Sequence, residues 1–396
     1  MPLTYDPSSF KLTDSRRPGR RAAVIGLIAL AANIAGFAAN EPRFFHAYLT
    51  AYMFWLSIAI GCLFFVMLHH LVAARWSVVI RRLSESVAVL MPLMAILFIP
   101  VIFGLHDLYH WSDAAAVAHD DVLQHKAPFL NITFFVIRAV IYFGVWSLLS
   151  ILLRKMSVAE DSGYDEARRV RMRRLSAGGM LIFAFTTTFA AFDWIMSLDA
   201  HWYSTIFGAY VFAGAVVGAI SFMILIVLYL HRNGILTNVI TTEHYNDLGK
   251  LLFAFTIFWA YMAFSQYFLI WYANIPEETI YYAHRWVGSW KAVSLYLVFG
   301  HFVIPFFLLL PKTWKRHRWF LAAISIWMLI AHWFDLFWMV LPGLQPQGAH
   351  ISWMDPLLMV GIGGIFVSAF WRMFGAHALI PVRDPKLEGS IHSLSY

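Results

Sequence analysis

The sequence predicts an all-α integral membrane protein with about ten transmembrane helices. Of its 396 residues, 61% are hydrophobic and only 13% are charged, and the mean hydropathy is +0.67. Soluble domains are closer to half apolar and a quarter charged, so lipid must cover much of this chain. The apolar residues form long continuous runs and not the short alternating segments of a membrane β-barrel, which favours helices.

A helix that spans a bilayer needs roughly 20 mostly apolar residues. The chain offers ten such runs, at 22–40, 46–72, 84–105, 129–153, 176–198, 205–231, 249–272, 291–310, 318–340 and 353–374. We therefore expect a polar N-terminal tail over 1–21, a ten-helix membrane domain over 22–374 and a polar C-terminal tail over 375–396. The first apolar run is interpreted as a retained helix and not as a cleaved signal, because the tail before it is polar.

The basic residues predict the orientation of the chain. With the N-terminus inside, the inner segments hold 24 Lys and Arg residues and the outer loops hold 4. Because the side richer in Lys and Arg faces the cytoplasm, both termini are expected there. The net charge of +7 comes from short basic runs between apolar segments, so it indicates membrane orientation and not a nucleic-acid partner.

The polar residues repeat between two halves of the chain. The fifth and ninth helices each carry an aspartate near the outer end, Asp193 and Asp335, and the fourth and eighth carry Arg138 and His301. This pattern predicts two parallel four-helix bundles, helices 2–5 and 6–9, flanked by helices 1 and 10.

Ionisable side chains at membrane depth cost at least about 2.5–3.5 kcal/mol, so they normally face a bundle interior and have a partner. His332 and Asp335 are three residues apart and share one helix face. Desolvation raises the pKa of a carboxyl and a nearby cation lowers it. A carboxyl for which the two effects balance can exchange protons near neutral pH. The candidates for proton transfer are Arg138, Asp193, His301, His332 and Asp335. The alternative is that these are buried pairs that fix the register of the helices.

Further polar groups extend this hypothesis toward the inner side. Histidines at the inner ends of the second and sixth helices, His69, His70 and His231, are candidates for proton entry. A bis-histidine haem is not expected, because these residues lie at a different depth from His301 and His332. Softer polar residues that could line a hydrated path are Ser57, Thr186, Thr187, Thr188, Ser265, Gln266, Tyr267 and Ser294.

Three loops and one cysteine complete the predictions from residues. Segment 106–126 is rich in His and Asp and is expected to form an amphipathic helix on the outer face, near a partner or a quinol site that involves His106, Asp107 and His110. A metal on His106 and His110, four residues apart, is the less favoured alternative. We expect 154–174 to be a solvated inner loop and 274–291 an ordered outer loop. The single cysteine, Cys62, excludes an internal disulfide and a cysteine-ligated iron–sulfur cluster.

Three stretches are more specific than membrane composition requires. They are 192–198 (FDWIMSL) with 201–208 (HWYSTIFG), 247–255 (DLGKLLFAF), and 265–267 (SQY) with 270–279 (IWYANIPEET). Together they resemble the ActF family, the second NrfD-like membrane subunit of alternative complex III, a bacterial quinol:electron acceptor oxidoreductase. The likeness covers about 20–375, and only Asp193 among the candidate residues lies in a matched motif.

The resemblance implies ten helices in two four-helix bundles and a subunit without a redox cofactor of its own. It also implies partners: a related NrfD-like subunit, an iron–sulfur protein, and multihaem and monohaem cytochromes c, with cytochrome c or a terminal oxidase as the electron acceptor. Haem c and iron–sulfur clusters would then belong to those subunits, and a quinone such as menaquinone would be the only cofactor near this chain.

The sequence therefore favours an accessory subunit that contributes a proton-transfer path coupled to quinol oxidation. A quinol-binding subunit and a scaffold, in which buried charges only set packing, are the alternatives. A secondary transporter is less favoured, because no pair of Gly- or Pro-interrupted helices occupies matching positions in the two halves.

Overall fold

The computed structural model describes residues 10–12 and 16–393. This part of the chain has 78% helix and no strand. Within the described residues, ten helices are long and apolar enough to cross a membrane, which confirms the predicted all-α membrane fold. The helices that build the ten spans are α1 (Arg16–Ala39), α2 (Glu41–Leu71), α3 (Val78–Ala88), α4 (Met91–Leu97), α5 (Ile99–Phe103), α9 (Ile132–Ala159), α10 (Glu166–Trp194), α11 (Phe207–Arg232), α12 (Thr242–Ala273), α14 (Trp290–Tyr296), α15 (Ile304–Leu309), α17 (Arg318–Val340) and α18 (Met354–Phe374).

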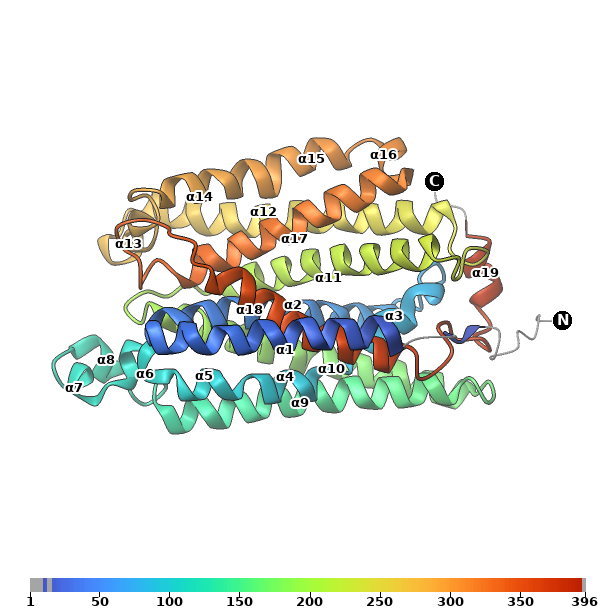
Figure 1. Cartoon of the computed structure of the whole chain (residues 1–396), viewed down its shortest axis with the longest axis horizontal. Coiled ribbons are helices and arrows are strands. Elements are labelled where there is room, and N and C mark those ends of the chain that lie inside the picture. Colours follow the sequence, from blue (N-terminus) through green and yellow to red (C-terminus); the bar gives the residue numbers. More distant parts are fainter. Residues whose placement is uncertain (1–9, 13–15, 394–396) are drawn as a thin grey trace.

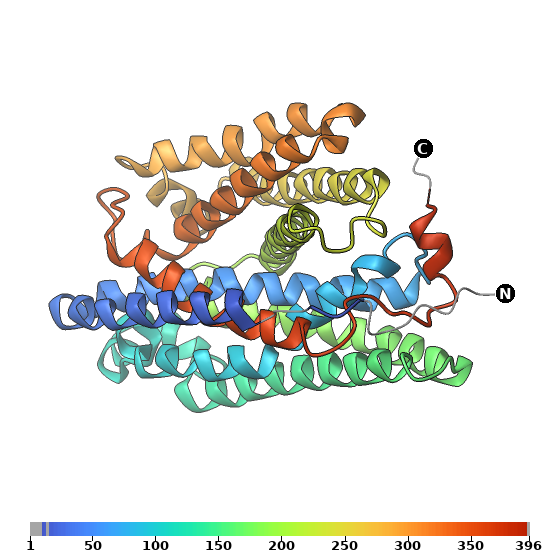
Figure 2. The ribbon, with the colours of Figure 1, turned by 45° about the vertical axis from the view of Figure 1, so that its right-hand side comes forward.

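The spans pack as two groups joined in the middle of the molecule. In the first group α2, α3, α4, α9 and α10 are in contact, and in the second α11 contacts α12 and α17, while α15 packs against α12. Helices α2 and α11 pack against each other and join the groups, as Figures 1 and 2 show. Both helices are mostly buried, as expected for spans that contact protein on nearly every side.

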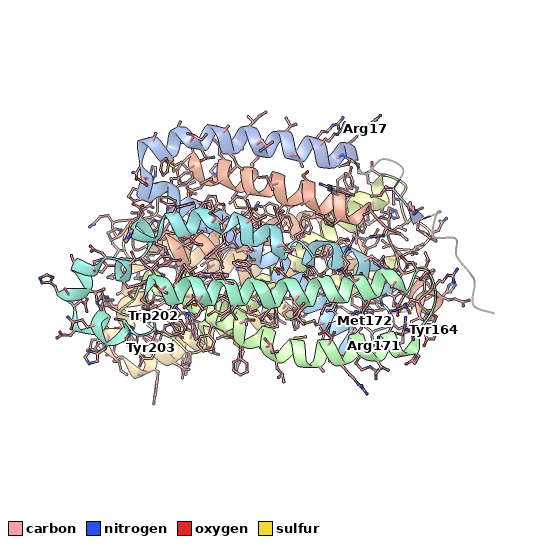
Figure 3. All side chains as sticks on the ribbon, turned by 90° about the horizontal axis from the view of Figure 1, so that it is seen from below. Arg17, Tyr164, Arg171, Met172, Trp202 and Tyr203 are labelled. Atoms are coloured by element: carbon pink, nitrogen blue, oxygen red, sulfur yellow. The ribbon has the colours of Figure 1, made fainter. Side chains whose placement is uncertain are left out.

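Helices α1 and α18 form a pair on one side of the two groups (Figures 1 and 3). Their backbones approach closely through small residues: a Cβ on Gly26 would lie 2.9 Å from the carbonyl oxygen of Gly361 and 2.9 Å from Cα of Gly364. The hydrophobic effect does not drive membrane helices together, because lipid tails are as apolar as the helices. Small residues let the two backbones approach closely and associate through van der Waals contact. The pair flanks the bundles, as predicted for helices 1 and 10.

Two spans are interrupted. The third span, Val78–Phe103, consists of α3, α4 and α5. Pro92 and Pro100 lie in the first turns of α4 and α5, because a helix tolerates proline only in its first turn. The eighth span, Trp290–Leu309, contains a π-helical segment, Leu297–Val303. The third span is the second helix of the first group, whereas the eighth span is the third helix of the second group. The two interruptions therefore do not occupy matching positions in the two groups.

The helices that enclose segment 154–174 extend beyond their predicted ends. Helix α9 runs to Ala159 and α10 begins at Glu166, so little of the segment is a loop. Part of the predicted N-terminal tail is also helical, because α1 starts at Arg16; residues 1–9 and 13–15 of that tail, and 394–396 of the C-terminal tail, lie outside the described residues. The start of α1 and the short helix α19 (Leu387–Ile391) lie at one end of the molecule, the α19 end, and α13 (Pro276–His284) lies at the other, the α13 end (Figure 1).

Candidate functional site

Asp193 lies on α10 inside the first bundle and forms a bidentate ion pair with Arg138 of α9. Nε of Arg138 donates to Oδ2 at 2.7 Å and Nη2 donates to Oδ1 at 2.8 Å. The hydroxyl of Tyr142 donates to the same Oδ2 at 2.8 Å. The Asp193 side chain is fully buried, so its charge is matched by a fixed guanidinium and one hydroxyl.

The rest of the Arg138 guanidinium is also held. Nη1 donates to the carbonyl of Phe129 at 2.9 Å, and the rings of Phe129 and Phe134 have centroids 3.9 and 4.4 Å from Cζ. Arginine has only donors and does not lose its proton in proteins. The carboxylate form of Asp193 is therefore stabilised by a cation that cannot leave.

Asp335 lies on α17 inside the second bundle and has a different set of neighbours. The Tyr210 hydroxyl of α11 donates to Oδ1, and Nε1 of Trp259 on α12 donates to Oδ2 at 2.9 Å. Asp335 is 1% exposed, and no Lys, Arg or His of the described chain forms an ion pair with it. A deep carboxyl is thus held by two neutral donors alone.

Two buried histidines lie close to Asp335. His332, one turn earlier on α17, makes a 2.8 Å hydrogen bond through Nε2 to Oγ of Ser57 on α2 and has no partner at Nδ1 in the described chain. A Cβ on Gly214 of α11 would lie 3.2 Å from Nδ1 of His332 and 3.5 Å from Oδ2 of Asp335, so both side chains face this glycine. Ser57, one of the predicted path residues, therefore joins the first bundle to this site.

The second histidine, His301, is fully buried and has no hydrogen-bond partner at either ring nitrogen within the described residues. Its ring packs on Trp259 with centroids 3.8 Å apart, and Trp259 is the donor to Asp335. His301 lies in the π-helical segment Leu297–Val303, a type of irregularity that often marks functional sites. Pro305 has no N–H to bond the carbonyl of His301 four residues earlier, which explains the local change of helix.

The two aspartates occupy matching places: each lies five residues before the end of its span, Glu166–Leu198 or Arg318–Val340. Their partners do not match, because Arg138 binds Asp193 directly whereas His301 reaches Asp335 only through Trp259. Of the five deep candidates, the structure brings His301, His332 and Asp335 together in one bundle and Arg138 with Asp193 in the other.

Sequence reasoning missed Arg285, which follows α13. It is 4% exposed and donates to the carbonyls of Trp338 and Met339 at the end of α17, at 3.1 and 3.2 Å. Its Cζ lies 3.4 Å from the ring centroid of Tyr281. Burial lowers the pKa of the Arg285 guanidinium, and the negative end of the α17 dipole stabilises its charge. In the sequence Arg285 is one of the outer-loop charges, and its spacing gives no other signal.

A buried ionic network at the α19 end shows that segment 154–174 is not a solvated loop over its whole length. Glu160 is only 1% exposed and binds Arg169 at 3.1 Å and Arg81 at 3.4 Å. Asp384, from the C-terminal segment, binds Arg81 at 2.9 Å and Arg169 at 2.7 Å. Burial alone would raise the pKa of Asp384, but Arg81 and Arg169 outweigh it and lower that pKa. Part of the high charge density therefore reflects pairing between helix ends, while Arg171, Arg173 and Arg174 of the same segment are exposed.

The predicted inner histidines divide between two places. His69 contacts Oγ of Ser77 at 2.7 Å and Nη1 of Arg81 at 3.3 Å, and it lines a cavity with His70. His231 instead contacts Arg318 at the start of α17. The structure does not bring the three histidines together.

Segment 106–126 is not one amphipathic helix. It breaks into α6 (Leu105–Leu108), a 3₁₀ turn (His110–Ser112), α7 (Ala114–Ala118) and α8 (Asp121–Lys126). Asp113 and Asp120 accept backbone N–H groups and start α7 and α8, and Tyr109 is extended. His106 and His110 are therefore not on one helical face, both are exposed, and Asp107 is half-buried. The described residues hold no cluster of three or more His, Cys, Asp or Glu suited to a metal.

No protein-family model matches the chain, and a search of curated proteins found no similar sequence. The ActF-like assignment, with its quinone, haem and iron–sulfur partners, therefore stays a prediction from the sequence motifs. The fold defines the chain as a multi-pass membrane protein with two unlike buried carboxyl sites.

Proposed function

We propose that this chain is a proton-transferring membrane subunit of a quinol-oxidising respiratory complex, and that Asp335 is its proton-exchanging group. The observation that carries the proposal is the surroundings of Asp335: within the described residues it has two neutral donors and no cation as partners, and two buried histidines with unpartnered ring nitrogens lie in the same bundle. A structural ion pair would resemble Asp193, where every acceptor is matched to a guanidinium or hydroxyl.

The neighbours of Asp335 suit both of its protonation states. When Asp335 is ionised, the hydroxyl of Tyr210 and the indole N–H of Trp259 both donate to it. When Asp335 is protonated, the Tyr210 hydroxyl can turn and accept, because a hydroxyl has both roles. Arg138 has no acceptor and could not adapt in this way at Asp193.

His332 is the residue best placed to exchange a proton with Asp335. The two side chains face Gly214, and a neutral imidazole can accept a proton at one ring nitrogen while it keeps a hydrogen bond at the other. The bond from His332 to Ser57 leads toward α2 and the first bundle. His301, whose ring packs on Trp259, is a second acceptor in the same bundle.

Electrons would move elsewhere. The resemblance to NrfD-like subunits supports partners that carry haem c and iron–sulfur clusters, while this chain supplies the proton step. The excess of Lys and Arg supports the orientation with the α19 end in the bacterial cytoplasm and Asp335 toward the outer side.

The test is proton translocation per quinol oxidised, in vesicles that contain the assembled complex. We expect Asp335→Asn to keep quinol oxidation and to lower proton movement. The matched control is the double variant Arg138→Gln, Asp193→Asn, which removes the charge pair of the other bundle and should leave the proton ratio unchanged. An unchanged ratio in an assembled Asp335→Asn complex would assign Asp335 to packing and favour the scaffold alternative.

A further inference from the structure

A cavity of about 300 Å³ opens at the α19 end and plays no part in the carboxyl sites. It lies where the end of α2, the turn that follows it, the first turns of α10 and the C-terminal segment meet. Its wall includes four Lys and Arg side chains against two carboxylates: Arg81, Arg169, Arg173 and Lys386, with Glu166 and Asp384. Figure 3 shows Tyr164 and Met172, two further lining residues, at this end of the molecule.

The basic wall is positioned by bonds that lie behind it. Asp384 and Glu160 each bind both Arg81 and Arg169, which fixes these two guanidinium groups. Nζ of Lys386 donates to the carbonyl of Ala73 at 2.5 Å. Because these side chains are already ordered, a ligand would meet them without the usual loss of side-chain entropy.

Two lining groups have no partner that would explain them. His70 is 9% exposed, and its Nε2 makes no hydrogen bond within the described residues. A buried polar nitrogen of this kind normally has a partner. Arg173 is exposed at the mouth and forms no ion pair with any described residue, unlike Arg169 one turn earlier on α10. Both groups can donate to an anion in the cavity.

We infer that this cavity binds a phosphate group. Arg173 and Lys386, the two lining cations that form no ion pair with a described residue, and the buried histidine match the charge and the acceptor oxygens of phosphate. The volume is at the lower end of ligand sites, so it admits a headgroup and not acyl chains. Basic pockets between transmembrane helices on the cytoplasmic side commonly take lipid headgroups. The phosphate belongs to an anionic phospholipid of the inner leaflet or to a soluble phosphate ester. Binding measurements with a lipid and with inorganic phosphate distinguish these two sources.

The test measures binding of short-chain phosphatidylglycerol to the purified full chain in detergent, with phosphatidylcholine and inorganic phosphate as the other probes. We expect Arg173→Gln to weaken phosphatidylglycerol binding about tenfold. The matched control is Arg171→Gln on the same helix, which removes the same charge outside the cavity wall (Figure 3) and should change binding less than about twofold. Lys386→Gln provides a second variant from another segment.

Each outcome separates the sources or ends the proposal. Phosphatidylglycerol binding that inorganic phosphate displaces supports the site with a lipid headgroup in it. Inorganic phosphate binding that depends on Arg173, without phosphatidylglycerol binding, supports the site for a soluble ester. The inference is overturned if neither probe binds, if phosphatidylcholine binds equally well, or if Arg171→Gln weakens binding as much as Arg173→Gln.

Discussion

The two bundles place an aspartate at the same distance from the end of a span, yet surround it differently. Asp193 is held by Nε and Nη2 of Arg138 and by the hydroxyl of Tyr142, whereas Asp335 has only the hydroxyl of Tyr210 and the indole N–H of Trp259. The first arrangement keeps one charge state, and the second accepts either. A deep carboxyl therefore cannot be assigned a role from its position alone; its partners decide whether it fixes packing or exchanges protons.

The largest expected effect comes from breaking the fixed pair. Arg138→Gln leaves the Asp193 carboxylate buried without a cation, which should cost about 3–5 kcal/mol of stability. Thermal unfolding of the purified protein in detergent measures the loss. Adding Asp193→Asn should restore most of it, because the uncompensated charge is then gone. If the single variant unfolds like the wild type, the pair does not stabilise the first bundle.

A matched pair of tyrosine variants sharpens the comparison. Tyr210→Phe leaves Asp335 with a single donor and should cost about 1.5–3 kcal/mol, the usual range for a hydrogen bond to a charged group. Tyr142→Phe also removes a bond to a charged carboxyl, but Asp193 keeps both bonds to Arg138, so the loss should be smaller, about 0.5–1.5 kcal/mol. Unfolding midpoints of the two variants compare them directly. Equal losses would mean that the two carboxyls depend equally on their hydroxyl donors.

A smaller effect is expected at the glycines that face His332. A Cβ on Gly218 would lie 3.0 Å from Cδ2 and 3.4 Å from Nε2 of His332. Gly218→Ala should push the imidazole from Ser57 and cost about 1–2 kcal/mol through overpacking. The number of protons translocated per quinol oxidised by the complex should also fall in this variant. Gly178→Ala is the control, because nothing lies within 4 Å of a Cβ there. A normal proton ratio in Gly218→Ala would remove the His332–Ser57 bond from the path.

The smallest effect on stability is predicted for Asp335→Asn. The amide keeps an oxygen that accepts from Tyr210 or Trp259, and no cation is left unpaired, so the loss should stay below about 1 kcal/mol. Thermal unfolding in detergent, run beside Arg138→Gln, tests this contrast. A loss as large as that of Arg138→Gln would show that Asp335 is a structural anion like Asp193.

The sequence predicted the parts of this account that depend on runs of residues within one helix. Apolar runs located the ten spans, and the depth of Asp193 and Arg138 suggested that a cation would compensate a carboxyl there. Contacts between residues far apart in the sequence could not be predicted in this way. Asp384 binds Arg81 although the two are 303 residues apart in the sequence, and Arg285 is buried against the end of α17. The π-helical segment at His301 follows from Pro305, but its packing on Trp259 required the structure.

The central claim is that Asp335 changes its protonation state while Asp193 does not. Infrared difference spectra of the full chain, recorded across a pH titration, detect the carbonyl stretch of each protonated carboxyl. We predict a pH-dependent carboxylic acid band that is lost in Asp335→Asn and kept in the double variant Arg138→Gln, Asp193→Asn. A band lost with the Asp193 variant and kept in Asp335→Asn would contradict the account and move the exchanging group to the first bundle.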